Sequence, residues 1–268
     1  MTSTTADYIS THKRFWEIDV VRTVAIVGML TFHTLDILYY FDLYPTNMLY
    51  GFWWWWIRRV NAGLFIFPAG VALTIAYSRG KRMPEFLLRG LKIKLSGFML
   101  RGLKIFGLGM VITLLSLLVV PDQYVRFGIL HFFGIAFVLA PFFLRFRFIN
   151  LILGAALMVI GVYLLEQRVL VDFPWLLWLG LRPYHFNTLD YFPLLPWFGL
   201  FLMGMFFGKI LYPQGNRRFN IPEFSNPVAS ALTFPGRHPL VIYFAHFPIV
   251  IGVLLALYPD KILPYIRF

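Results

Sequence analysis

The first long apolar segment of the chain carries four ionisable residues, Asp19, Arg22, His33 and Asp36. Arg22 and His33 are eleven residues apart, so on an α-helix they share one face, with a rise of about 16 Å between them. Asp36 follows His33 by three residues and shares its face. A carboxylate beside an imidazole can hold one tautomer and raise its basicity, as an orienting acid does beside a catalytic base. Asp19, three residues before Arg22, is placed to pair with it.

This spacing has two interpretations. Ionisable residues in an apolar span are costly and usually face the interior of a helix bundle or a water-filled path, which makes them candidates for function. On that interpretation His33 and Asp36 are catalytic and Arg22 binds an anionic group. In the alternative, Arg22 reaches lipid head groups and His33 makes a hydrogen bond to another helix.

Two more histidines lie in apolar segments, His131 in the stretch FGILHFFG and His246 in the stretch LVIYFAHFP. Both are candidates for substrate binding if they converge with His33 on one cavity. Each is also typical of a hydrogen bond between helices. No two histidines share a helix at a spacing of three or four residues with an acid between them, so we expect no metal site.

The second apolar segment begins with four tryptophans, Trp53–Trp56, followed by Arg58, Arg59 and Asn61. The tryptophans are typical of an aromatic belt at the membrane–water interface. Arg58 and Arg59 point about 100° apart on a helix, so at most one of them faces a given cavity squarely. Arg58 and Asn61 are the predicted substrate-binding residues of this segment.

A third group of candidates lies in the stretch DYFPLLPWFG, which begins at Asp190. Asp190, Tyr191 and Trp197 could bind a sugar, because an aromatic ring beside an acid suits polyols. The alternative is a helix cap followed by interfacial aromatic residues. We include Asp190 and Trp197 among the predicted substrate-binding residues.

The composition indicates where these segments lie. Hydrophobic residues make up 59% of the 268 residues and charged residues 13%, against roughly 45–50% and 25% in soluble domains. A membrane span needs about 20 mainly apolar residues. The sequence therefore predicts an all-α polytopic transmembrane helix bundle in the cell membrane, with about seven spans (eight being the alternative) and a single domain over residues 1–268. The predicted spans are Ile18–Phe41, Phe52–Tyr77, Ile105–Val120, Val125–Leu144, Phe148–Leu165, Tyr191–Tyr212 and Pro239–Tyr258.

Basic residues set the expected orientation. With the N-terminus in the cytoplasm, sixteen Lys and Arg residues fall in inner connections and five in outer ones, which is the bias expected of cytoplasmic loops. The net charge of +12 is therefore assigned to contacts with membrane lipids and a phosphorylated small molecule, and not to nucleic acid. Residues Met1–Ser10 have no apolar core, so we expect no cleavable signal peptide. The absence of cysteine excludes disulfides and thiolate metal sites.

Three connecting segments do not have the character of a span. Pro84–Lys104 is basic and amphipathic, and we expect it in the inner interface, either as a lipid anchor or with some cations facing a bound phosphate. Phe173–Leu181 is too short to cross and is predicted to be interfacial or re-entrant. Pro213–Arg237 is predicted to be a cytoplasmic loop.

Five stretches, in order along the chain, carry a resemblance to a known family. They are EIDVVRTVAIVGMLTFHTLD (17–36), NAGLFIFPAGVAL (61–73), VRFGILHFFGIA (125–136), DYFPLLPWFGLFLMG (190–204) and GRHPLVIYFAHFPIV (236–250). The spacing of Arg22 and His33 resembles the signature of transmembrane acyltransferases. The ordered set resembles the catalytic domain of heparan-alpha-glucosaminide N-acetyltransferase and its small prokaryotic relatives, over nearly the whole chain.

The resemblance implies a membrane-bound acetyltransferase. It would take the acetyl group from cytosolic acetyl-CoA and pass it through the bundle to an amine or hydroxyl of a sugar or glycolipid on the opposite side. Arg22, with Arg101 and Lys104, would bind the CoA phosphates. His33 would act as general base or accept the acetyl group transiently, so direct and ping-pong transfer both stay open. A homodimer is also left open.

Two alternatives to an enzyme follow from the same residues. The chain could be a transporter or channel in which the buried His, Arg and Asp side chains form a proton or solute path. It could also be a membrane scaffold without catalysis.

Overall fold

The computed structural model describes residues 14–44, 51–81, 89–167, 169–223 and 226–265. A short parallel pair of strands, β1 (Leu170–Val171) and β2 (Arg182–Pro183), lies between α6 and α7. The other regular elements of the described residues are helical: α2 (Trp16–Tyr40), α3 (Phe52–Lys81), α4 (Arg89–Val119), η2 (Pro121–Gln123), α5 (Ile129–Phe143), α6 (Phe148–Glu166), α7 (Leu194–Leu211), η3 (Pro213–Gly215), α8 (Pro227–Arg237), α9 (Pro239–Leu257), α10 (Pro259–Ile262) and η4 (Leu263–Tyr265).

Six helices in the described part of the chain are long and apolar enough to cross a membrane: α2, α3, α4, α6, α7 and α9. This confirms the predicted all-α polytopic bundle and makes the chain a multi-pass integral membrane protein. A seventh apolar helix, α5, has 15 residues. It rises only about 22 Å, less than the roughly 30 Å hydrocarbon core of a bilayer.

The predicted start of the third span was wrong. α4 is one continuous helix over Arg89–Val119, and the candidate membrane span within it already includes residues 97–104, before Ile105. Residues 89–104 therefore belong to the same helix as the span, and their predicted place in the inner interface stays a prediction; residues 84–88 lie outside the described residues. Arg101 and Lys104 lower the hydropathy of this stretch, but both are good helix formers and do not interrupt the helix.

Two other predicted spans are shorter in the structure. α5 begins at Ile129 rather than Val125, because Gly128 before it is extended. α7 begins at Leu194 rather than Tyr191, because Pro193 is extended as well. The stretch Phe173–Leu181 forms turns and no helix, and no membrane-crossing helix includes it.

The connection predicted as a loop over Pro213–Arg237 contains a helix, α8. Asn226 caps its N-terminus by accepting a hydrogen bond from the N–H of Ala229 at 2.8 Å. Pro227 takes the first helical position, where its fixed φ is suitable. The loop prediction was wrong because the segment is short and polar, and its face with Ala229 and Thr233 becomes buried only by tertiary packing.

The described chain divides into two compact units. One contains Met1–Pro68 with Ile221–Phe268, and the other contains Ala69–Asn220. α3 contributes its residues up to Pro68 to the first unit and the remainder to the second. The two units are described separately.

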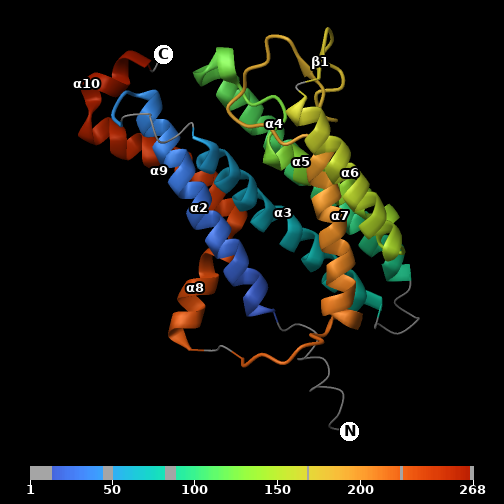
Figure 1. Cartoon of the computed structure of the whole chain (residues 1–268). Helices are drawn as coiled ribbons and strands as arrows, with labels where there is room; N and C mark the ends of the chain where they lie inside the picture. The colour runs from blue at the N-terminus through green and yellow to red at the C-terminus, as the bar shows by residue number, and fades with distance from the viewer. Residues whose placement is uncertain (1–13, 45–50, 82–88, 168, 224–225, 266–268) are drawn as a thin grey trace. The chain divides into compact units, whose positions relative to one another are not determined.

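In the first unit, α8 and α9 follow one another along α2 (Figure 1). α8 packs on the N-terminal part of α2. Toward the C-terminal end, Ile37 and Phe41 form an apolar cluster with Leu254 of α9 and Ile262 of α10. Two consecutive helices from the end of the chain therefore cover one helix from its beginning.

In the second unit, α4 packs with α5 and α6 packs with α7 (Figure 1). Both pairs approach closely at glycines, as helices in membranes commonly do. A Cβ on Gly102 of α4 would meet the carbonyl oxygen of Gly134 at 2.6 Å, and a Cβ on Gly199 of α7 would meet that of Gly154 at 2.5 Å. These contacts leave no room for a larger residue.

The ends of α5 are joined to the ends of α7. At the beginning, the N–H of Ile129 donates to Oδ2 of Asp190 at 2.8 Å, four residues before α7. At the other end, Nζ of Lys209 donates to the carbonyl oxygen of Leu144 at 2.5 Å. α5 and α7 therefore run parallel and extend between the same two ends of this unit.

Candidate active site

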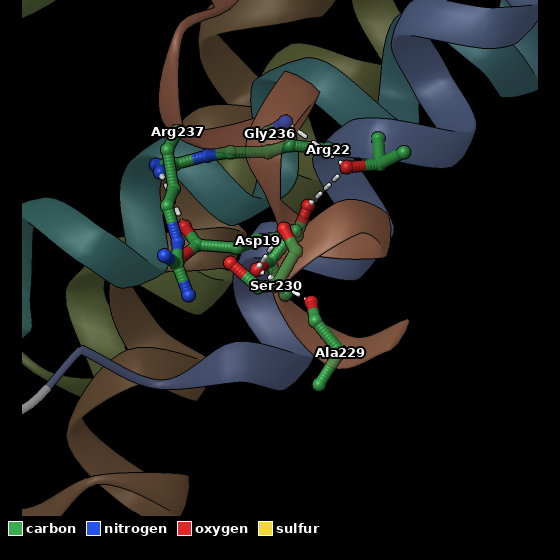
Figure 2. A network of polar contacts seen from close by, with 8 residues as sticks. Asp19, Arg22, Ala229, Ser230, Gly236 and Arg237 are labelled. Atoms are coloured by element: carbon green, nitrogen blue, oxygen red, sulfur yellow. Dashed lines mark hydrogen bonds and ion pairs between the residues drawn. The ribbon is translucent and has the colours of Figure 1, made fainter. Parts of the chain in front are cut away.

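The N-terminal end of α2 holds a buried carboxylate between two arginines. Asp19 is 5% exposed. Nη1 of Arg22 lies 3.9 Å from its Oδ1, and Nε of Arg237 lies 3.5 Å from its Oδ2. Figure 2 shows the two guanidinium groups reaching Asp19, one from α2 and the other from the last residue of α8. Two cations and one anion give this cluster a net positive charge.

A backbone contact holds α8 in this position. The N–H of Gly236 donates to Oγ1 of Thr23 at 2.9 Å, and that hydroxyl donates to the carbonyl oxygen of Asp19 at 3.0 Å. A Cβ on Gly236 would overlap this carbonyl oxygen. The close approach carries Arg237 to Asp19.

About three turns further along α2, two histidines meet. Nδ1 of His33 lies 2.7 Å from Nε2 of His246 on α9, and the planes of the two rings are nearly parallel, at 20°, with centroids 4.9 Å apart. Nδ1 of His246 lies 2.6 Å from the carbonyl oxygen of Tyr243. His246 is 5% exposed and contacts the ring of Phe247 edge-on. The structure therefore brings together two of the three histidines expected to converge.

The side chain of Asp36 forms an ion pair with Arg58 of α3. We expected Asp36 to orient the imidazole of His33. Among the described residues, however, the hydrogen-bond partner of His33 is His246. The ion pair brings Arg58 beside the C-terminal half of α2. Its neighbour Arg59 turns to the ring of Trp55 at 3.2 Å, so the two arginines point apart, as predicted.

Asn61 joins α3 to α2. Its Nδ2 donates to the carbonyl oxygen of Ala25 at 3.1 Å, and the missing side chain of Gly28 leaves room for it. This bond accounts for a polar residue within the span. The predicted role of Asn61 in substrate binding stays a prediction.

The other predicted site residues lie in the second unit, and their ligand roles stay predictions. Arg101 and Lys104 are exposed on α4, where the guanidinium of Arg101 lies 5.8 Å from the ring of Phe137. His131 is 2% exposed, and both its ring nitrogens have partners, the N–H of Gly128 at 3.2 Å and Oγ1 of Thr113 at 3.3 Å. These contacts cap the start of α5.

Asp190 also caps α5, through the hydrogen bond from Ile129. Burial raises the pKa of its carboxyl to about 6, although hydrogen bonds from the backbone N–H groups of Ile129 and Tyr191 oppose this shift. Burial likewise raises the pKa of Tyr191 above its ordinary value. Trp197 packs on Phe192 with ring centroids 5.2 Å apart. The hydrogen bond from Ile129 supports the interpretation of Asp190 as a helix cap. Its role in sugar binding stays a prediction.

Residues 14–248 match the family described as heparan-alpha-glucosaminide N-acetyltransferase, catalytic. The chain belongs to this family. The match confirms the resemblance of the five stretches and includes α2, the two arginines at Asp19 and both histidines of the pair. No curated protein and no solved structure gives a significant match. Membership makes the chain a membrane acetyltransferase.

Arg237 is not among the site residues that the sequence predicts. Without α8, it is only one of the cations of an expected inner loop. The stretch GRHP, with glycine and arginine directly before an apolar helix, was the available signal. In the described part of the chain, no three His, Asp or Glu side chains gather into a group that could hold a metal ion.

Proposed function

We propose that this protein transfers the acetyl group of acetyl-CoA to an amine or hydroxyl of a sugar or glycolipid. The observation that carries the proposal is the arrangement along α2 in a member of an acetyltransferase family. A positive cluster lies at one end, and a histidine pair lies about 16 Å further along the same helix. That distance suits a donor whose phosphates bind at the cluster and whose pantetheine arm extends toward the histidines.

The donor would enter from the cytoplasmic side. Arg22 and Arg237 are suited to its phosphates because guanidinium groups bind phosphate oxygens in a planar, two-pronged geometry. Asp19 would hold both arginines in place between turnovers. The binding of CoA phosphates by Arg101 and Lys104 stays a prediction from the sequence.

The chemistry requires one base. The imidazole of His33 takes the proton from the acceptor amine or hydroxyl while that nitrogen or oxygen attacks the carbonyl carbon of the thioester. The tetrahedral intermediate collapses with cleavage of the carbon–sulfur bond, and the CoA thiolate receives the proton from the imidazolium. The products are the acetylated acceptor and free CoA. In a ping-pong route, His33 itself would carry the acetyl group between two such steps.

The acceptor would approach from the opposite side, near the end of α2 that holds Asp36 and Arg58. Their ion pair offers an acceptor oxygen and a donor group to a sugar. The family name points to a glucosamine amine as the acceptor, and amino sugars are therefore the first compounds to test.

The test uses the full chain in nanodiscs, with release of free CoA measured against a panel of amino sugars. His33→Ala should lower kcat by at least about 100-fold, the scale of a lost general base. Arg22→Ala should raise the KM for acetyl-CoA about tenfold or more with a smaller change in kcat, because it removes donor binding.

Exposed residues elsewhere supply the controls, His185→Ala for the histidine and Arg145→Ala for the arginine. Full activity of His33→Ala, or no acetyl-CoA-dependent release of CoA with any acceptor, would overturn the proposal. Acceptor-driven ion flux in liposomes without acetyl transfer would favour a transporter.

A further inference from the structure

The directions of the hydrogen bonds in the histidine pair follow from the carbonyl group that His246 contacts. The carbonyl oxygen of Tyr243 can only accept a hydrogen bond, and it lies 2.6 Å from Nδ1 of His246. Nδ1 of His246 must therefore carry a proton and donate it. In the neutral ring the other nitrogen, Nε2, then has a lone pair and can only accept.

The position of the proton on His33 follows in the same way. Nε2 of His246 lies 2.7 Å from Nδ1 of His33, so Nδ1 of His33 is the donor of this hydrogen bond. A neutral His33 thus carries its proton on Nδ1, and its Nε2 is the unprotonated, basic nitrogen. One backbone carbonyl determines the tautomer of both rings.

We propose that His246 is a positioning residue that holds His33 in the Nδ1–H tautomer, with Nε2 as the nitrogen that takes the proton of the acceptor. The proposal deepens the proposed function and rests on it for the catalytic role of His33. It replaces Asp36 as the orienting group, because the hydrogen-bond partner of His33 is His246 while Asp36 pairs with Arg58.

The relay of hydrogen bonds from His33 to His246 and on to the carbonyl oxygen of Tyr243 also favours the positive charge that forms on His33 during the reaction. When Nε2 of His33 takes a proton, the ring becomes an imidazolium that still donates from Nδ1 to His246. A hydrogen bond from a charged donor is stronger than one from a neutral donor. The pair therefore stabilises the protonated state more than the resting state, which lowers the barrier rather than only tightening binding.

The surroundings keep the second ring in place. The rings of Tyr243 and Phe247 lie 5.7 Å and 5.0 Å from the ring of His246. Pro248 has no N–H, so it cannot donate to the carbonyl oxygen of Phe244, one turn earlier in α9. His246 is thus held by packing and by its own helix, and it needs no charged residue to set its proton.

The experiment compares His246→Gln with His246→Leu in the full chain in nanodiscs. The amide oxygen of glutamine can accept the hydrogen bond from His33, whereas leucine fills the space without an acceptor. We expect kcat to fall about 100-fold or more in His246→Leu, the scale of general-base catalysis. We expect a decrease of less than about tenfold in His246→Gln, with the KM for acetyl-CoA little changed in both. Equal decreases in the two variants, or an unchanged kcat in His246→Leu, would overturn the proposal.

A second readout does not depend on turnover. In protein labelled with ¹⁵N-histidine, the signal that is lost in His33→Ala identifies His33 and its protonated nitrogen. Protonated Nδ1 in the wild type and a shift toward protonated Nε2 in His246→Leu are the expected results. Protonated Nε2 in the neutral wild-type ring would contradict the relay. Full activity of His33→Ala would instead contradict the proposed function, so the two failures are distinguishable.

Discussion

Two carboxylates of this protein are held in different ways. Asp19 is buried between the guanidinium groups of Arg22 and Arg237, so groups of opposite charge lie next to its carboxylate. The carboxylate of Asp190 accepts a hydrogen bond from the backbone N–H of Ile129, and the pKa of its carboxyl rises to about 6. Burial disfavours an ionised carboxyl unless charges or hydrogen bonds compensate for it.

Asp190→Asn should change the pH dependence of stability. The pKa of Asp190 is higher in the folded state than its ordinary value of 3.8, so the folded state binds more protons and its stability falls as the pH rises from about 4 to about 6. Asparagine can still accept the hydrogen bond from Ile129 but does not ionise. The variant should therefore gain in Tm relative to the wild type as the pH rises through this range.

Thermal melts in detergent at a series of pH values test this prediction. Asp122→Asn, at an exposed carboxyl, is the matched control. A Tm difference between Asp190→Asn and the wild type that stays constant from pH 4 to 7 would show that ionisation of Asp190 does not affect stability.

At the scale of elements, α2 organises the first unit. It is packed by α8 and α9 in turn and bonded to α3 through Asn61 and Asp36. Each partner brings one side chain of the proposed site: Arg237 from α8, His246 from α9 and Arg58 from α3. The closest approach is at Gly236, so this glycine sets how near α8 can come to the carboxylate of Asp19.

Gly236→Ala should destabilise the protein by about 1–3 kcal/mol, the usual cost of overpacking. The added Cβ would meet the backbone carbonyl of Asp19, which cannot move without shifting α2. Gly252→Ala on α9 is the control, because nothing lies within 4 Å of its Cβ; it should be neutral or slightly stabilising. Tm in detergent and the KM for acetyl-CoA are the measurements. An equal Tm for Gly236→Ala and Gly252→Ala would contradict the close contact of α8 with α2 as the cause.

At the scale of the whole molecule, α5 decides the number of crossings. Its beginning is bonded to the residues before α7, and its end to Lys209 near the end of α7. Because α5 extends between the two ends of a candidate membrane-spanning partner, we predict that it also passes through the bilayer, although it has only 15 residues. With the orientation expected from the positive-inside bias, we predict that the segment between α6 and α7 lies outside the cytoplasm.

Single cysteines test this topology cleanly, because the chain has none of its own. Asp122→Cys and Asn187→Cys should react with an impermeant maleimide from outside the cell, and Asn220→Cys only after the membrane is opened. The first two share a side because the N–H of Leu189 donates to the carbonyl oxygen of Gln123 at 2.8 Å. Labelling of Asp122→Cys and Asn187→Cys from opposite sides would contradict the crossing of α5.

Local properties of the chain were sufficient for the class of the protein and for its first site residues. Hydropathy depends on the residues within a span, so most spans could be predicted within a few residues. The shared face of Arg22 and His33 follows from helical repeat alone. The prediction failed at α4, where cations lie in a continuous helix. It also failed at α8, whose apolar face becomes buried only when it packs on α2.

The partners of these residues depended on the tertiary structure. His33 and His246 are 213 residues apart in sequence, as are Thr23 and Gly236, and no periodicity connects such positions. Sequence spacing offered Asp36 as the nearest partner of His33, whereas packing gives Asp36 to Arg58 and His33 to His246. The sequence by itself determined a membrane acetyltransferase with an arginine and a histidine on one helix. Only the packing of α8 and α9 on α2 decided which side chains complete the two ends, because those contacts form between helices that are distant along the chain.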